Sequence, residues 1–221
     1  EGFHRCLAGA LSKCGFYALV LTLTDREVDL LDRTRPRTAA DIYNRHHFKK
    51  DKTKDGGKIQ SAARYIYRVL RGRKPSTDEV VDVMNKYQEH LLWAARTFTK
   101  LPYNGSSRGA LALYHVIDRG EAEALAQALL AKTKKEKDAL TPEMRATAKR
   151  IEKLAKSPLR CSQQYNATMS YVVALLYVMS KHHEGITVGE VPILEKFSTT
   201  EHRREALQGV EWARRRLSRR T

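Results

Sequence analysis

Arginine side chains recur at helical spacing between residues 59 and 74. With Ile59 placed at 0° and each residue advancing by about 100°, as in an α-helix, the apolar residues of this stretch gather on one side. The opposite side carries the polar ones: Gln60, Ser61, Arg64, Arg68 and Arg71. Arginine can grip guanine O6 and N7 or clamp phosphate, and glutamine can pair with adenine. The pattern predicts a DNA-recognition helix; the alternatives are an ordinary surface helix with solvated arginines, or a helix that binds RNA or another polyanion.

Further bases flank this helix. Arg73 and Lys74 follow it. Five lysines precede or begin it: Lys49, Lys50, Lys52, Lys54 and Lys58. Lysines in such a loop would lie near a phosphate backbone and fix the register without reading the sequence. From the arginine-rich end of the chain, Arg214 and Arg215 complete the set of candidate nucleic-acid-binding residues.

Arg108 and His115, separated by six residues, are a second arrangement that could do chemistry. Their spacing resembles the arginine–histidine motif of HEPN ribonucleases, which are helical proteins with a basic groove. The resemblance implies metal-free acid–base cleavage of RNA by these two residues. It covers eight residues of the chain, and Gly109 stands where the family carries a polar residue. The other interpretation of His115 is a half-buried core histidine beside Tyr114.

Histidine and cysteine spacing gives no sign of a metal centre or an activated nucleophile. The pairs His46-His47 and His182-His183 would each point about 100° apart on a helix, so each is a poor chelate. The HExxH, Walker and GxSxG motifs are absent. We therefore predict no metal, no cofactor and no enzymatic activity. The chain has three cysteines, Cys6, Cys14 and Cys161. Their odd number and the lack of ligand-like spacing favour a reducing compartment.

The net charge of +16 is concentrated in three segments of the 221 residues. Residues 45–74 hold eleven bases against two acids, residues 132–160 hold ten against four, and residues 202–221 hold seven against two. Neutral or acidic segments rich in apolar residues separate these blocks. Positive charges in such an excess repel one another and destabilise a folded chain. An anionic partner would offset this repulsion, and we therefore expect one. An apolar content of 42 % is enough for a folded core.

Capping residues and helix breakers outline three helices around the first basic block. They are expected over residues 25–33, 39–47 and 59–72. Their order has the layout of a helix-turn-helix unit, with the third helix in the recognition position. The connection before that helix is about ten residues, whereas the compact motif uses a turn of three or four. A connection of this length would also fit a winged-helix variant or another three-helix arrangement.

The rest of the chain also has helical signals. Ser76 opens a capping box for a helix to about Thr99, and Thr141 followed by Pro142 starts another. Trp212 lies off the apolar stripe of the last helix and is expected to complete an edge of the core. Because strand alternation is almost absent, the predicted class is all-α. The remaining helices are expected over residues 107–120, 121–138, 160–183 and 199–218.

These observations predict two helical parts, a helix-turn-helix-like DNA-binding region over residues 1–74 and a bundle with basic outer faces over residues 75–221. The bundle would support dimerisation, a protein partner or extra backbone contacts. The longest apolar run is too short to span a bilayer, and no secretory signal is visible, so we expect an intracellular protein without membrane contact.

Duplex DNA binding, as in transcriptional regulators or replication and partition proteins, is the expected function. The first alternative is an RNA-binding helical nucleoprotein or a subunit of a ribonucleoprotein complex. A HEPN-like ribonuclease is the second alternative, and a structural role in a ribonucleoprotein assembly is the third.

Overall fold

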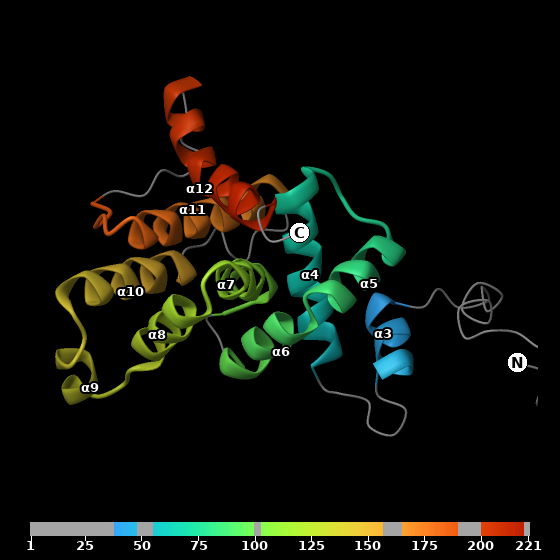
Figure 1. The fold of residues 1–221 in the computed structure, drawn as a ribbon, viewed down its shortest axis with the longest axis horizontal. Coiled ribbons are helices and arrows are strands. Elements are labelled where there is room, and N and C mark those ends of the chain that lie inside the picture. The colour runs from blue at the N-terminus through green and yellow to red at the C-terminus, as the bar shows by residue number, and fades with distance from the viewer. Residues whose placement is uncertain (1–37, 48–54, 100–102, 157–164, 190–199, 219–221) are drawn as a thin grey trace, which may run out of the picture. The chain divides into compact units, whose positions relative to one another are not determined.

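Helices account for most of the residues that the computed structural model describes, namely 38–47, 55–99, 103–156, 165–189 and 200–218 (Figure 1). The chain divides into the units Glu1–Thr38 and Ala39–Thr221, and every helix named below belongs to the second. The helix predicted over residues 25–33 lies outside the described residues. No strand occurs in the described ranges, which confirms the all-α class.

Ten helices follow one another in the described part of the chain. None of them combines the length and apolar character that crossing a membrane requires. Their bounds are α3 Ala39–His47, α4 Gly56–Arg71, α5 Thr77–Lys86, α6 Gln88–Thr97, α7 Gly105–Ile117, α8 Arg119–Leu130, α9 Lys134–Asp138, α10 Pro142–Ala155, α11 Tyr165–His183 and α12 Thr200–Ser218.

Local capping signals set several of these bounds. Ser76 begins α5, where its Oγ accepts from the backbone N–H of Glu79 at 3.3 Å and the Glu79 carboxylate accepts from the backbone N–H of Ser76 at 2.9 Å. Thr141 caps α10 in front of Pro142, and its Oγ1 accepts from the backbone N–H of Met144 at 3.2 Å. Both predicted helix starts are confirmed. Side-chain oxygens at these positions satisfy amides that have no partner within the helix.

Two predicted helices are each split into two. The helix expected from Ser76 to Thr99 is interrupted at Tyr87, and the resulting helices α5 and α6 both pack against α4. The segment expected as one helix over residues 121–138 becomes α8 and the short α9, which has its own capping box from Thr133 to Glu136. In the first case no glycine or proline stands at the break, so the sequence carries no local signal for it.

The centre of the fold is α7, in which every residue from Gly105 to Ile117 is buried. It packs against α4, α6, α8, α11 and α12 (Figure 1). This helix begins at Gly105, where Asn104 caps it, and not at Ser107 as predicted. Gly105 allows α7 to approach α4 closely, because a Cβ atom added there would lie 2.6 Å from Ser61 Cβ.

The helix-turn-helix arrangement is not confirmed by the described helices. α3 and α4 do not form a helical unit separate from the following helices, because α3 packs against α5 and α4 packs against α7. The division of the chain at residue 74 therefore stays a prediction.

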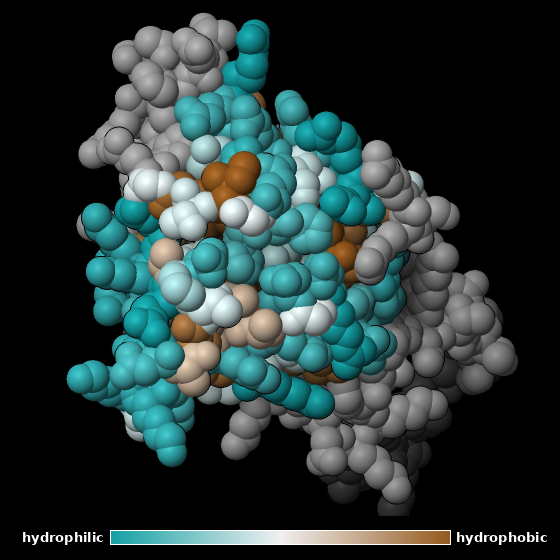
Figure 2. Space-filling view, turned by 60° about the vertical axis from the view of Figure 1, so that its left-hand side comes forward, coloured by the Kyte–Doolittle hydropathy of each residue, from teal (hydrophilic) through white to brown (hydrophobic). Residues whose placement is uncertain are grey.

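A second close helix pair, α11 and α12, completes the core. All residues from Tyr171 to Ser180 on α11 are buried, and they include the apolar run from Tyr171 to Met179 that the sequence predicts at the centre of the bundle. Trp212 on α12 is also buried, with its ring centroid 5.9 Å from that of Tyr114 on α7, which confirms its place at the core. The side on which α8 to α10 lie is mostly hydrophilic, with apolar residues only in small separate areas of the view in Figure 2.

Candidate nucleic-acid interface

The open side of α4 is a narrow strip that carries arginines. Within this helix Gly57, Arg64 and Arg71 are exposed, and Arg68 is half-buried. Counted at about 100° per residue, Arg64, Arg68 and Arg71 fall within about 60° of the helix circumference. The three arginines selected from the sequence therefore share the part of α4 that its described neighbours leave most open.

Gln60 does not belong to this open side. The sequence predicted it on the polar face, but only 8 % of the residue is exposed. The prediction of an accessible Gln60 is wrong because α4 is packed by α3, α5, α6, α7 and α12, so that it has more neighbours than a simple two-sided surface helix. Ser61 also turns towards a neighbour, since it meets Gly105 of α7.

The arginines of the open side differ in how firmly they are held. Arg64 and Arg71 have no acidic partner among the described residues. The guanidinium carbon of Arg68 lies 5.4 Å from the ring centroid of Tyr65, one turn earlier, in a cation–π contact. Arg64 and Arg71 are thus the side chains with most freedom to bind an external anion, and Arg68 lies between them on a fixed aromatic support.

Arg214 brings the last basic block of the sequence to the end of α4. Its Nε donates a hydrogen bond of 2.8 Å to the carbonyl oxygen of Val69, although 145 positions separate the two residues. Carbonyl groups at a helix C-terminus have no partner within the helix and carry partial negative charge, so a cation there is favourable. Two basic blocks that are remote in sequence therefore meet at this point.

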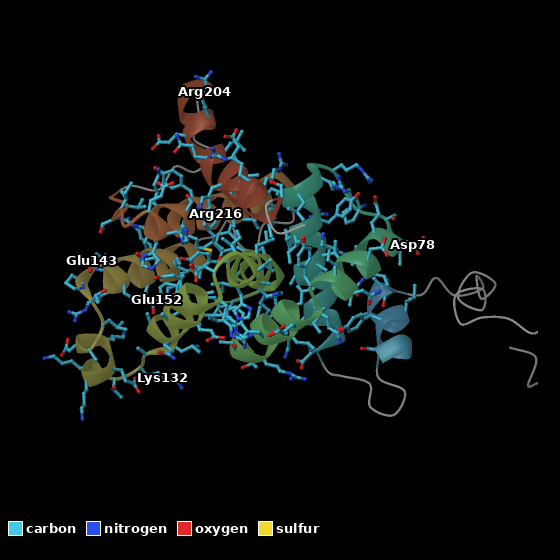
Figure 3. All side chains as sticks on the ribbon, viewed as in Figure 1. Asp78, Lys132, Glu143, Glu152, Arg204 and Arg216 are labelled. Atoms are coloured by element: carbon cyan, nitrogen blue, oxygen red, sulfur yellow. The ribbon has the colours of Figure 1, made fainter. Side chains whose placement is uncertain are left out.

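The neighbouring arginines on α12 take different directions. Arg216, labelled in Figure 3, approaches α11, where its Nη2 lies 3.1 Å from His183 Nε2. Arg215 is exposed and keeps its Nε near the carbonyl oxygen of Glu211, at 3.4 Å, within its own helix. No contact joins Arg215 to α4 among the described residues, so we define the basic strip as the three arginines of α4 with the bases around the end of this helix: Arg64, Arg68, Arg71, Arg73, Lys74 and Arg214.

The remaining predicted lysines do not join the strip. Lys58 forms an ion pair with Asp55, with 2.8 Å between Nζ and Oδ1, at the opposite end of α4. Asp55 also lies 4.0 Å from Arg96 on α6. The predicted contact of Lys58 with phosphate would therefore have to compete with an existing carboxylate. The other four predicted lysines lie outside the described residues: Lys49, Lys50, Lys52 and Lys54.

Arg73 is the member of the strip with a firm acidic partner. Its guanidinium binds the carboxylate of Glu79, which also accepts a hydrogen bond from the hydroxyl of Tyr67. The bonds from Arg73, from Tyr67 and from the backbone of Ser76 lower the pKa of Glu79 to about 2. Glu79 therefore stays ionised across the working pH range, and it offsets the charge that Arg73 could offer to a phosphate.

The two residues that resemble the HEPN motif are occupied inside the core. Arg108 is buried, and its Nε donates a 2.8 Å hydrogen bond to the carbonyl oxygen of Phe98. His115 is fully buried rather than half-buried, with 1 % of the residue exposed. Its ring stacks on Trp93 at a centroid distance of 4.1 Å, and its Nδ1 lies 2.7 Å from His90 Nδ1. No open groove containing Arg108 and His115 results from these contacts.

The buried position of His115 predicts a loss of stability in acid. Burial lowers the pKa of this imidazole, more than the carboxylate of Glu123 near its Nε2 raises it. The folded protein then binds the proton less readily than the unfolded chain, whose histidines titrate near 6.5. The free energy of unfolding should therefore decrease as the pH falls below about 6.5, since protons bind preferentially to the unfolded state.

Urea denaturation between pH 7.5 and 5 measures this dependence. His90, Glu89, Arg119 and Glu123 face the same site, so the matched variant is His115→Gln, which removes only the titrating ring. This variant should be less stable at pH 7.5 and show a smaller decrease on acidification. An equal decrease in the two proteins would contradict the assignment to His115.

The second histidine pair meets two different acidic residues. His182 Nε2 lies 3.2 Å from Glu121 Oε2, and His183 Nδ1 lies 3.8 Å from Asp118 Oδ2, both at the start of α8. Each of the two histidines thus lies near a different carboxylate. In the described ranges, no group of three or more His, Cys, Asp or Glu side chains could hold a metal ion.

The pairing of Arg214 with α4 and the burial of Gln60 were not evident from the sequence. A helical wheel identifies the residues that share one side of a helix, but it does not identify the neighbours that cover that side.

The chain matches no protein-family model, no curated protein and no solved structure.

Proposed function

We propose that this protein is a non-enzymatic nucleic-acid-binding protein whose basic strip contacts backbone phosphates, with duplex DNA as the favoured partner. The observation that carries the proposal is the position of Arg214, from the distant last basic block, at the C-terminal end of α4, the helix whose open side carries Arg64 and Arg71. Like charges gathered in this way repel one another, and a row of phosphates offsets that repulsion.

Phosphate contact is a better match to this geometry than base reading. The arginines occupy a strip of about 60° on α4, whereas insertion into a major groove needs a helix face that is open over a larger part of its circumference. The glutamine that could have paired with adenine is buried. We therefore expect binding that depends more on the backbone than on base sequence.

A salt-titrated comparison of duplex DNA, single-stranded DNA and RNA tests this function. For duplex DNA the logarithm of the association constant should fall linearly with the logarithm of the salt concentration, by about 0.9 for each phosphate that the protein neutralises. Duplex DNA should bind most tightly. Absence of binding to all three at about 50 mM salt, a concentration at which phosphate contacts are strong, would overturn the proposal.

The same titration distinguishes the alternatives. Tighter binding to single-stranded RNA, with saturation that does not depend on its length, would favour a helical RNA nucleoprotein instead. RNA recovered in shortened form after incubation with the purified protein would favour the ribonuclease.

A further inference from the structure

A cleft with a volume of about 480 Å³ opens between α4 and α5, beside the C-terminal end of the basic strip. Tyr67 and Tyr87, each 7 % exposed, contribute aromatic surface and Leu70 and Val83 contribute aliphatic surface, whereas the other five lining residues are charged. Clefts of about 300–1,000 Å³ with mostly apolar walls and a few polar groups are typical binding sites for small organic groups. The volume therefore suits a small organic group, and the charged residues of the lining favour a group that itself carries charge.

Two cations of the cleft are available to an anion. Arg71 from α4 and Lys86 from α5 both line it, and neither has an acidic partner among the described residues. The Lys86 Nζ lies 5.5 Å from the ring centroid of Tyr87. Burial raises the pKa of the Tyr87 hydroxyl, and the nearby charge of Arg71 opposes this change, so both cations lie close to the same ring. A phosphate group would find a positive charge from each helix.

The two acidic residues of the cleft differ from each other in availability. Glu79 is fully engaged by Arg73, Tyr67 and the backbone of Ser76. Asp82 lines the cleft without an ion-pair partner among the described residues. A carboxylate repels phosphate, but it accepts hydrogen bonds from the exocyclic amino group of a nucleic-acid base. The cleft thus combines aromatic walls, an anion-binding pair and an acceptor for amino groups.

We infer that this cleft receives one unpaired nucleotide of the bound strand, with its phosphate between Arg71 and Lys86 and its base against the tyrosines and Asp82. The inference rests on the proposed function, because Arg71 belongs both to the basic strip and to the cleft. Bases stack readily on aromatic side chains, and such stacking does not require a particular base. A strand gains contacts along Arg64 and Arg68 that a free mononucleotide lacks, so the strand is the expected source of the nucleotide.

A duplex with a three-nucleotide single-stranded overhang, compared with a blunt duplex of the same paired length, tests the inference. The overhang carries 2-aminopurine, whose fluorescence falls when the base stacks. We expect the overhang to increase affinity on the order of tenfold, the range that base–aromatic stacking supports, and to lose fluorescence on binding. Adenosine monophosphate serves as the free nucleotide and should bind far more weakly than the overhang duplex.

Variants connect the signal to the cleft. Lys86→Gln should bring the ratio of overhang to blunt affinity towards one, whereas Lys153→Gln, at an exposed lysine of α10, should leave that ratio unchanged. Tyr87→Phe keeps the ring and should keep the fluorescence loss. Tyr87→Leu should abolish it, with melting curves recorded to show that the variant is folded.

Three results would overturn the inference. Equal affinity for overhang and blunt duplexes, with unchanged fluorescence, would reject the cleft but leave the proposed function standing. Absence of salt-dependent binding to either duplex would remove the proposed function and the inference with it. Adenosine monophosphate that binds as tightly as the overhang duplex would assign the cleft to a free nucleotide instead of a strand.

Discussion

Replacing Arg64 and Arg71 with alanine together is expected to weaken duplex DNA binding on the order of a hundredfold at low salt, because hydrogen bonds to charged groups contribute about 1.5–3 kcal/mol each. The salt dependence should also become shallower, by about 0.9 for each phosphate that the variant no longer neutralises. Both side chains are exposed and have no acidic partner among the described residues. The free energy of unfolding should therefore change by no more than about 0.5 kcal/mol, as is usual at such surface positions.

The matched control removes the same charge elsewhere. Lys149 and Lys153 on α10 are exposed and lie one turn apart, so Lys149→Ala with Lys153→Ala also deletes two positive charges. Titration of both double variants with one labelled duplex should show a much larger decrease in affinity for the arginine pair. Equal decreases would mean that binding follows net charge, and an unaffected arginine variant would exclude the strip as the interface.

Several elements of this fold could be predicted because their signals are local. Gly72 ends α4 in the left-handed conformation, with a φ of 71°, as expected of a glycine after a helix. Thr141 with Pro142 starts α10, and the apolar run from Tyr171 to Met179 forms the centre of the core. In each case, a few neighbouring residues carry the whole signal.

Other elements depend on contacts between distant segments and could not be predicted. Tyr87 separates α5 from α6 within a stretch whose sequence looks uniformly helical, and both of these helices pack against α4. Gly105 precedes the helix start that was predicted at Ser107, but it lies inside α7, where α4 leaves no room for a side chain. The periodicity of apolar residues along one helix does not show where another helix will cross it.

The residues of the candidate site also fall into those that the sequence could predict and those that it could not. Spacing alone selected Arg64, Arg68 and Arg71, because the side of a helix on which a residue lies depends only on its position in the sequence. The same wheel placed Gln60 on the polar face, and the structure buries it. Arg214 could be recognised as basic, but its hydrogen bond to Val69 depends on how α12 crosses the end of α4. Which residues share one surface therefore depends on the tertiary packing of the helices.

The contact between α11 and α12 leads to the largest expected effect on stability, at Gly209. A Cβ atom added to this glycine would lie 2.6 Å from the Cα atom of Tyr177 and 2.5 Å from the backbone carbon of Leu176. Backbone atoms cannot rotate away as a side chain could, so α12 would have to move off α11. Gly209→Ala should lower the free energy of unfolding by about 3 kcal/mol or more, at the upper end of overpacking costs, as measured by urea denaturation.

Gly57→Ala is the control, because it makes the same substitution in a helix where an added Cβ would have nothing within 4 Å. There alanine should stabilise the protein by up to about 1 kcal/mol, since it has the higher helix propensity. Displacement of α12 in the Gly209 variant would also withdraw Arg214 from Val69, so duplex binding should weaken together with stability. A Gly209→Ala protein as stable as the parent would contradict the close crossing of α11 and α12. A destabilised but folded variant with unchanged affinity would separate Arg214 from the interface.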